Sequence, residues 1–505
     1  MSETLPRLEN LPALGPLRDD FPDRAEPIGK DARGSIFSAS FWLRPVPERI
    51  LADLVMFLEV SLLWVSGYAA FQYVYGPEPL SPSAGPYAAL VITGTFLWMV
   101  GAQWSTGYSS AELVRLKSLG TAGLCWTGVV MALLTLSFLL KLMDEPFRNA
   151  LVLWFGGGAL SLLVCRAAAA GYISLLLRRG LLRRRIVVLG AAALGTRLTR
   201  HIEANAACNL TVSRLFSEAA TDLPGSIPDL SQSLDYIRQQ GIDCAVIALP
   251  LAEEARIMQL VGELRQLPVD VYVVTDGLGF NMRSDKAPNI AGIPMLVGAE
   301  RPLKEWRAVA KVVEDWAVAL TALCLTLPVL LIIAVAIKLD SPGPVFFRQP
   351  RLGFNQKIFH VFKFRTMYVD ACDKLGDRLT SKGDARVTRL GALLRKSSLD
   401  ELPQLLNVLA GDMSIVGPRP HPLNAKAADK RYDEVVAGYA ARHRVKPGIT
   451  GWAQVNGWRG QTDTYEKIEK RVEHDLTYIE RWSVLFDLRI ILLTAVRGFY
   501  HHNAF

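Results

Sequence analysis

Residues 315–339 read DWAVALTALCLTLPVLLIIAVAIKL, and this stretch decides the fold class. As a straight α-helix these 25 residues would reach ~37 Å, which is enough to cross a bilayer. Basic residues flank both ends, however, and Pro328 in the middle removes a helix hydrogen bond and favours a kink. We expect a re-entrant helix over 315–339 that breaks at Pro328 and returns to the same membrane face. A plain fifth span with a proline kink is the alternative.

Four other apolar stretches precede this one, at residues 51–75, 87–104, 119–143 and 150–177. Each is near or above the ~20 residues needed to span the hydrocarbon core. Five arginines closely follow the fourth stretch, and Arg33, Arg44 and Arg49 lie shortly before the first, so the positive-inside rule places both ends of the unit in the cytoplasm. We predict a four-helix transmembrane domain over 50–178, preceded by a flexible cytosolic tail at 1–49.

Several charged residues fall within these stretches, and two of them bear on how the helices pack. Glu59 lies in the early turns of the first, where we interpret it as solvated near the helix end. Arg166 lies well inside the fourth and should face the helix bundle, although the sequence names no partner for it.

Residues 179–300 have the pattern of an α/β domain. RRRIVVLGAAALGTRLTRHI at 183–202 predicts a strand, a tight turn and the start of a helix, and buried strands follow at 243–250 and 269–276. This is a Rossmann-like pattern, but Ala192 stands where a pyrophosphate needs a glycine. We expect a degenerate domain used for regulation or assembly, and an active nucleotide site remains the alternative.

The overall composition narrows the function further. Half of the 505 residues are hydrophobic, and the net charge of +8 fits basic cytoplasmic loops. We find no interleaved basic and aromatic motif, so we expect no nucleic-acid partner. The six cysteines have no CxxC spacing and are interpreted as reduced packing residues.

Residues 301–505 carry the polar motifs, and the first is a predicted strand at 357–367. It places Lys363 and Arg365 at alternating spacing, so that both cations can point at a phosphate. A solvated, charged strand edge is the alternative.

Acidic residues come next, on a segment at 387–409 that is helix-prone and amphipathic. Asp400 and Glu401 are adjacent and would diverge by about 100° on a helix, while Arg395 can reach the same cleft. Such a pair suits a division of labour, in which one carboxylate acts and the other holds a cation. Surface charge is the simpler interpretation of two adjacent acids taken alone.

Two rigid loops complete the set. In DMSIVGPRP at 412–420, Pro418 and Pro420 fix the backbone on both sides of Arg419, which favours presenting its guanidinium to a phosphate or a base. KPGITGWAQVNG at 446–457 contains Gln454 and either binds substrate or packs.

These motifs occur in order, and together they resemble the bacterial sugar transferase family, the monotopic polyprenyl-phosphate hexose-1-phosphate transferases. The resemblance covers residues 314–505 and rests on DSPGPVFFRQPRLG, FKFRTM, RKSSLDELPQLLNVLAGDMSIVGPRP and KPGITGWAQVNG. It implies that Asp400 is the nucleophile, that Glu401 helps to hold Mg²⁺, and that Arg395 and Arg419 contact phosphate or nucleotide. Family members often break the re-entrant helix at Ser-Pro, whereas this chain has Leu327-Pro328.

The implied reaction transfers hexose-1-phosphate from a UDP-sugar to undecaprenyl phosphate and releases UMP. The C-terminal sequence looks most like members that transfer glucose-1-phosphate to initiate exopolysaccharide synthesis, with galactose as the alternative sugar. The implied location is the bacterial inner membrane, in contact with lipid and with the catalytic domain on the cytoplasmic face. A homodimer through the membrane helices is left open.

Two other functions remain as alternatives. A non-enzymatic scaffold for polysaccharide assembly would need no carboxylate nucleophile. A nucleotide-sugar dehydratase would need an intact dinucleotide loop and a Tyr-x-x-x-Lys pair in the middle domain, and neither is evident there.

Overall fold

The computed structural model describes most of the chain outside the N-terminal tail. The described residues are 48–76, 84–106, 113, 116–142, 144–205, 209–217, 230–275, 289–369, 384–423, 426–427, 430–432, 436, 438–458, 460 and 464–498. The tail predicted at 1–49 therefore lies outside them, except for its last two residues. The chain separates into two compact units, of which one holds the first four long helices.

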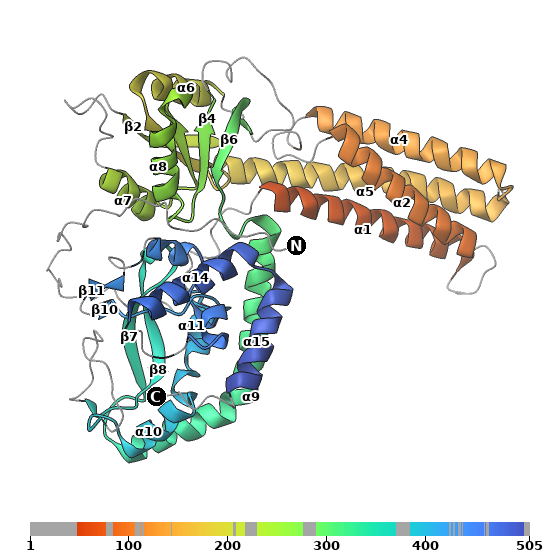
Figure 1. Cartoon of the computed structure of the whole chain (residues 1–505). Helices are drawn as coiled ribbons and strands as arrows, with labels where there is room; N and C mark the ends of the chain where they lie inside the picture. Colours follow the sequence, from red (N-terminus) through yellow and green to blue (C-terminus); the bar gives the residue numbers. More distant parts are fainter. Residues whose placement is uncertain are drawn as a thin grey trace, which may run out of the picture. The chain divides into compact units, whose positions relative to one another are not determined.

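That helical unit consists of four long apolar helices (Figure 1). They are α1 (Glu48–Tyr75), α2 (Ala84–Thr106), α4 (Leu116–Leu139) and α5 (Glu145–Arg178). Trp126 sits edge-on to both Trp98 and Trp154 in its core, with ring centroids 6.1 and 5.7 Å apart. Because buried indole N–H groups need partners, Trp154 donates to the backbone oxygen of Leu63 and Trp126 to that of Phe155. The indoles thereby fasten helices to one another.

Charged side chains also meet inside this unit. The guanidinium of Arg166 donates to the Glu59 carboxylate over 2.7 Å, and both side chains are almost fully buried. Arg166 also donates to the backbone oxygen and hydroxyl of Ser118 and lies over the Trp98 ring. The expectation that Arg166 faces the bundle is confirmed. The interpretation of Glu59 as a solvated residue is wrong, because the helix packing supplies an internal partner instead of water.

The α/β domain is a six-stranded sheet in the order β2-β1-β3-β4-β6-β5. The strands are β1 (Arg184–Gly190), β2 (Leu210–Ser217), β3 (Cys244–Ala248), β4 (Asp270–Val274), β5 (Asn289–Ile290) and β6 (Ile293–Ala299). Strands β1, β3 and β4 run parallel, and β6 is antiparallel to β4. The helices of the domain are α6 (Ala192–Ala204), α7 (Leu230–Gln240) and α8 (Glu254–Leu264).

The glycine turn of this domain has a packing explanation. Gly190 has φ of +143°, and a side-chain carbon there would lie 2.3 Å from the backbone oxygen of Ala248 on the neighbouring strand. A glycine is therefore required by the sheet itself, whether or not a nucleotide binds. The predicted α/β domain is confirmed. That it has lost nucleotide binding stays a prediction.

The C-terminal domain begins with the longest helix, α9 (Glu305–Asp340), which contains Pro328. The helix continues through Pro328, so the predicted break is a bend within one helix, and Figure 1 shows α9 changing direction along its length. Before the proline, Asp315 accepts hydrogen bonds from the Ser414 hydroxyl and the Ile415 backbone. After it, Ile337 lies in a core cluster with Leu394. Both halves of α9 thus pack against the same domain.

The rest of the domain consists of short elements. A hairpin of β7 (Phe346–Leu352) and β8 (Ile358–Phe364) is followed by α10 (Arg389–Lys396) and α11 (Gln404–Ala410). Strand β9 (Ser414–Val416) pairs in parallel with β12 (Gly448–Thr450). The remaining helices are α13 (Trp452–Val455), α14 (Tyr465–Arg481) and α15 (Val484–Gly498).

Within the described ranges, five helices are long and apolar enough to cross a membrane: the four of the helical unit and α9. The molecule is therefore a membrane protein that also carries an α/β domain and a C-terminal domain of mixed short elements.

Candidate active site

The two adjacent acids lie on a turn between α10 and α11. The segment predicted as one helix over 387–409 is divided, with a 3₁₀ turn at Leu399–Glu401 and left-handed backbone at Ser398, where φ is +58°. The helix-based angle between Asp400 and Glu401 therefore does not apply. The division has a local cause, since Ser397 and Ser398 compete for backbone hydrogen bonds and Pro403 favours a fresh helix start.

Glu401 is held by two cations. Lys363 on β8 donates to its Oε1 over 2.9 Å, and Arg419 donates to Oε1 and Oε2 over 2.5 and 3.1 Å. Burial alone would raise the pKa of Glu401, but the charges of Arg419 and Lys363 outweigh that effect and hold it well below the usual range. Glu401 is thus a fixed anion that positions Lys363 and Arg419.

Asp400 is different, although it is the next residue. Its side chain is only 9% exposed, and among the described residues no hydrogen bond or ion pair reaches its carboxylate. Burial raises the pKa of Asp400 to about 6, the adjacent Glu401 charge adds to this, and Lys363, Arg395 and Arg419 oppose it. The result is a carboxylate near three cations that is bound by none of them, which suits a nucleophile.

The remaining basic residues divide into two groups. Arg395 on α10 donates to the Thr366 hydroxyl over 2.8 Å, and its charge favours the ionised form of Asp400. Arg365 instead donates to the backbone oxygens of Ser341 and Pro342 where α9 ends. The expected pairing of Lys363 with Arg365 fails because β8 ends at Phe364, so strand alternation no longer sets the direction of Arg365.

The backbone of the Gly-Pro-Arg-Pro turn is held by hydrogen bonds from other segments. The Pro418 backbone oxygen accepts from the Gly448 N–H, which joins the turn to the β12 loop. Arg442 donates to the Arg419 backbone oxygen over 2.9 Å and forms a fully buried ion pair with Asp475. The sequence reasoning missed Arg442 and Asp475, because their partners are 23 to 33 residues away in the chain.

Gln454 lies on α13 and does not join the acidic pair. Its amide nitrogen donates to the Ile449 backbone oxygen over 3.4 Å, and its amide oxygen is buried without a hydrogen-bond partner in the described part of the chain. Its contact with substrate stays a prediction. The loop itself packs tightly, since a side-chain carbon on Gly451 would lie 2.3 Å from the Gly417 backbone oxygen.

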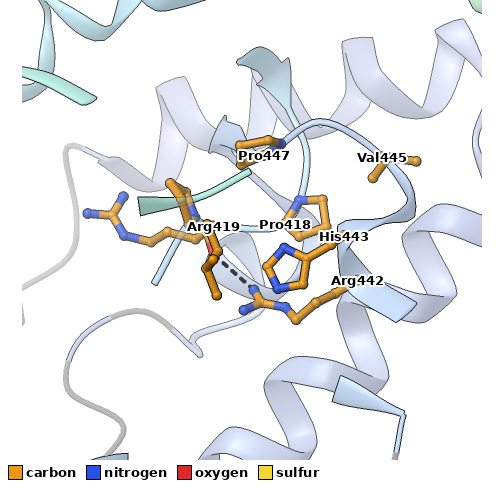
Figure 2. Close-up of a pocket in the computed structure, with 8 residues that line it drawn as sticks. Pro418, Arg419, Arg442, His443, Val445 and Pro447 are labelled. Atoms are coloured by element: carbon orange, nitrogen blue, oxygen red, sulfur yellow. Dashed lines mark hydrogen bonds between the residues drawn. The ribbon is translucent and has the colours of Figure 1, made fainter. Parts of the chain in front are cut away.

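A small pocket lies against the backbone of the Gly-Pro-Arg-Pro turn that carries Arg419 (Figure 2). Its walls are mixed, with prolines and aliphatic side chains beside the polar side chains of Arg442 and His443. The lining residues are Leu352, Pro418, Arg419, Pro420, Arg442, His443, Val445 and Pro447. Arg419 therefore contributes to both places, since it lines this pocket and its guanidinium reaches Glu401.

The donor set at the acidic pair is compatible with Mg²⁺. No group of three or more His, Cys, Asp or Glu side chains within the described ranges forms a ready-made metal cage. Lys363 and Arg419 donate three hydrogen bonds to Glu401, which leaves one acceptor position on Oε2 and both oxygens of Asp400. Hard carboxylate oxygens of this kind hold Mg²⁺ when water and substrate phosphate complete the shell.

The geometry defines a class: a membrane protein with a buried carboxylate surrounded by cations. Comparisons with known proteins identify the family. The family described as bacterial sugar transferase matches residues 306–501, and a family described as CoA-binding domain matches residues 106–275.

Curated relatives agree with this match. A UDP-glucose:undecaprenyl-phosphate glucose-1-phosphate transferase of Xanthomonas campestris pv. campestris is 35% identical over 88% of this chain and 93% of its own length. The protein of that name in Escherichia coli strain K12 is 40% identical over 72% of this chain and 78% of its own. An Aeromonas hydrophila UDP-N-acetylgalactosamine-undecaprenyl-phosphate N-acetylgalactosaminephosphotransferase is 41% identical over 36% of this chain and 41% of its own.

The chain therefore belongs to the bacterial sugar transferase family, and it is an enzyme, a phosphoglycosyl transferase. The resemblance found in the sequence is confirmed.

Proposed function

We propose that the enzyme transfers glucose-1-phosphate from UDP-glucose to undecaprenyl phosphate and releases UMP. The observation that carries the proposal is the contrast between Glu401, bound by two cations, and Asp400, which has no hydrogen-bond or ion-pair partner among the described residues. The names of the relatives from Xanthomonas and Escherichia support glucose as the sugar. Galactose is the alternative sugar.

The reaction proceeds in two substitutions at phosphorus. An Asp400 oxygen attacks the β-phosphate of the UDP-sugar, the bond to the α-phosphate oxygen breaks, and UMP leaves with the electron pair. The phosphate of undecaprenyl phosphate then attacks the aspartyl phosphosugar, and Asp400 is released as a carboxylate. An ionised carboxylate needs no general base for the first step.

The cations around Asp400 stabilise the charge of the diphosphate. Arg419 and Lys363 are oriented by Glu401, and Arg395 is oriented by Thr366, so the donors are placed before substrate binds. Mg²⁺ held by Glu401 and Asp400 would neutralise further phosphate charge. Pro418 fixes the backbone that presents Arg419.

We further propose that α9 is re-entrant and that the other four long helices span the inner membrane. The packing of both halves of α9 on one domain and the basic residues at both of its ends support this. A catalytic domain on the cytoplasmic face meets a soluble UDP-sugar and a lipid phosphate at headgroup level, so no phosphate has to enter hydrocarbon.

The test is nucleotide release by the purified protein given UDP-glucose, Mg²⁺ and undecaprenyl phosphate. We expect UMP. Release of UDP would mean ordinary glycosyl transfer and would refute the Asp400 mechanism, and UMP from UDP-galactose alone would reassign the sugar. Chelation with EDTA should stop release and added Mg²⁺ should restore it, and undiminished release in EDTA would refute the metal.

A further inference from the structure

The guanidinium of Arg365 binds the turn that ends α9. Its Nη1 donates to the Pro342 backbone oxygen over 2.7 Å, and its Nη2 donates to the backbone oxygen and the hydroxyl of Ser341 over 2.7 and 3.0 Å. A side-chain carbon on Gly343 would come within 2.0 Å of Nη1, so the guanidinium packs closely against this turn. Both Arg365 and Ser341 are almost fully buried.

This contact is directional. The three acceptors are neutral oxygens of one turn, and a charged donor strengthens each hydrogen bond. Because the donors of a guanidinium stand in a fixed planar fork, they set the orientation of the turn as well as its distance. Arg365 is therefore a rigid link between the end of α9 and the end of β8.

Strand β8 needs such a link because it belongs to a two-stranded ribbon with β7. A ribbon of two strands is marginally stable alone, so side chains must anchor it to the rest of the domain. Phe364, next to Arg365, is buried in a cluster with Ile333 and Ile337 of α9. On the other side of Phe364, Lys363 donates to Glu401 over 2.9 Å. The position of Lys363 thus depends on how the end of β8 is fastened to α9.

The residue after Arg365 supports the second cation. The Thr366 hydroxyl accepts from Arg395 Nε over 2.8 Å. The Thr366 backbone oxygen accepts from the Thr388 N–H over 3.1 Å, and the Thr388 side chain caps the start of α10. Arg395 and the helix that carries it therefore rest on Thr366, the immediate neighbour of Arg365.

We propose that Arg365 is a positioning residue: by fastening the end of α9 to residues 363–366, it holds Lys363 and Arg395 at Asp400. The inference rests on the proposed function, in which those two cations stabilise the charge of the diphosphate. It links the longest apolar helix to the reaction centre through one side chain. Arg365 itself touches no reacting atom in this proposal.

The measurement is kcat for UMP release from UDP-glucose with undecaprenyl phosphate as acceptor. Arg365→Met removes the donors at nearly the same side-chain length, and we expect kcat to fall by about 10- to 100-fold, because small displacements of catalytic groups cost this much. Arg348→Met is the matched control. It removes an exposed arginine of β7 whose guanidinium lies over the Phe362 ring, and it should leave kcat within about twofold.

Coupling between variants separates positioning from other roles. Lys363→Met and Arg395→Met each remove one of the two cations, so Arg365→Met has less left to disturb. In each of these backgrounds its effect on kcat should shrink to about 3- to 10-fold. A residue that only supports the fold, or one that binds substrate by itself, would cause the same fold-loss in every background.

Arg365→Lys is the second variant, and it decides the question if thermal melting shows that Arg365→Met is unfolded. Lysine keeps the charge but replaces the fork with a single ammonium, so kcat should fall by about 3- to 10-fold, and by less in the Lys363→Met background. An equal fold-loss in all backgrounds, or wild-type kcat in Arg365→Met, would overturn the inference. Failure of the proposed function looks different, because the wild type itself would then release no UMP and both proposals would fall.

Discussion

The helical unit and the C-terminal domain both bury a glutamate against an arginine, yet the two arrangements differ. In the helical unit, Arg166 donates hydrogen bonds to both Glu59 and Ser118. In the C-terminal domain, Glu401 takes two cations, and the carboxylate beside it, Asp400, takes none among the described residues. The paired charges hold helices together, whereas the unshared carboxylate among cations is the group for which we propose a chemical role.

The first way to break this comparison is Asp400→Asn. We expect turnover to fall by at least about 10³-fold, because the nucleophile is lost. The pKa of Asp400 is raised in the folded state, so its ionisation destabilises the fold increasingly from pH ~4 to pH ~6 and by a constant amount above. The variant should therefore be more stable than the wild type at pH 7, by about 1–3 kcal/mol.

The stability gain is measured by thermal melting at pH 7 and at pH 4, and it should vanish at pH 4. Near-normal UMP release by Asp400→Asn would refute the role of Asp400 and would favour a scaffold function if polymer synthesis continued.

Glu401→Gln should have the opposite effect on stability. The folded pKa of Glu401 is depressed, so its charge stabilises the fold above the unfolded pKa of ~4.3, and that contribution is lost as pH falls through the lower folded value. We expect the variant to melt lower at pH 7 and to lose about 10²- to 10³-fold in kcat, because Lys363 and Arg419 are no longer oriented. Comparing the melting temperatures of Asp400→Asn and Glu401→Gln at pH 7 checks the direction of each stability change. A stabilised Glu401→Gln would contradict the roles assigned to Asp400 and Glu401.

Turnover should also depend on pH through Asp400. With a pKa of about 6, the carboxylate is mostly ionised at pH 7 and half ionised at pH 6. We expect kcat/KM to fall about tenfold per pH unit below that point, in initial rates measured from pH 5 to 8. A profile that stays flat down to pH 5 would mean that Asp400 titrates lower or does not react.

The helical unit should show the smallest effect on turnover. Arg166→Met removes the guanidinium that faces the buried Glu59 carboxylate and should cost about 3–5 kcal/mol of stability, while kcat of the folded fraction stays unchanged. The double variant with Glu59→Leu should recover much of the stability, because both charges are removed together. A loss of kcat in the folded double variant would show that the pair acts on catalysis, and would remove the contrast between the two regions.

Local sequence patterns predicted a large part of the fold and the family. The apolar stretches predicted the long helices, because burial of backbone in lipid requires long apolar runs. The α/β pattern predicted the sheet domain through its buried strands. The order of the motifs identified the family, and the resemblance predicted roles for Asp400, Glu401 and Arg419.

Other features were decided by tertiary structure. The partner of Arg166 is 107 residues away, and Arg442 reaches Arg419 and Asp475 across 23 and 33 residues, so no local pattern reveals these contacts. Strand alternation predicted that Arg365 points toward a phosphate. Strand β8 ends at Phe364, one residue before it, and Arg365 instead donates to the Pro342 backbone oxygen. The sequence by itself determined which segments are apolar and which carry charge. The structure alone decided which charges are paired, because pairing depends on distances that only the folded chain sets.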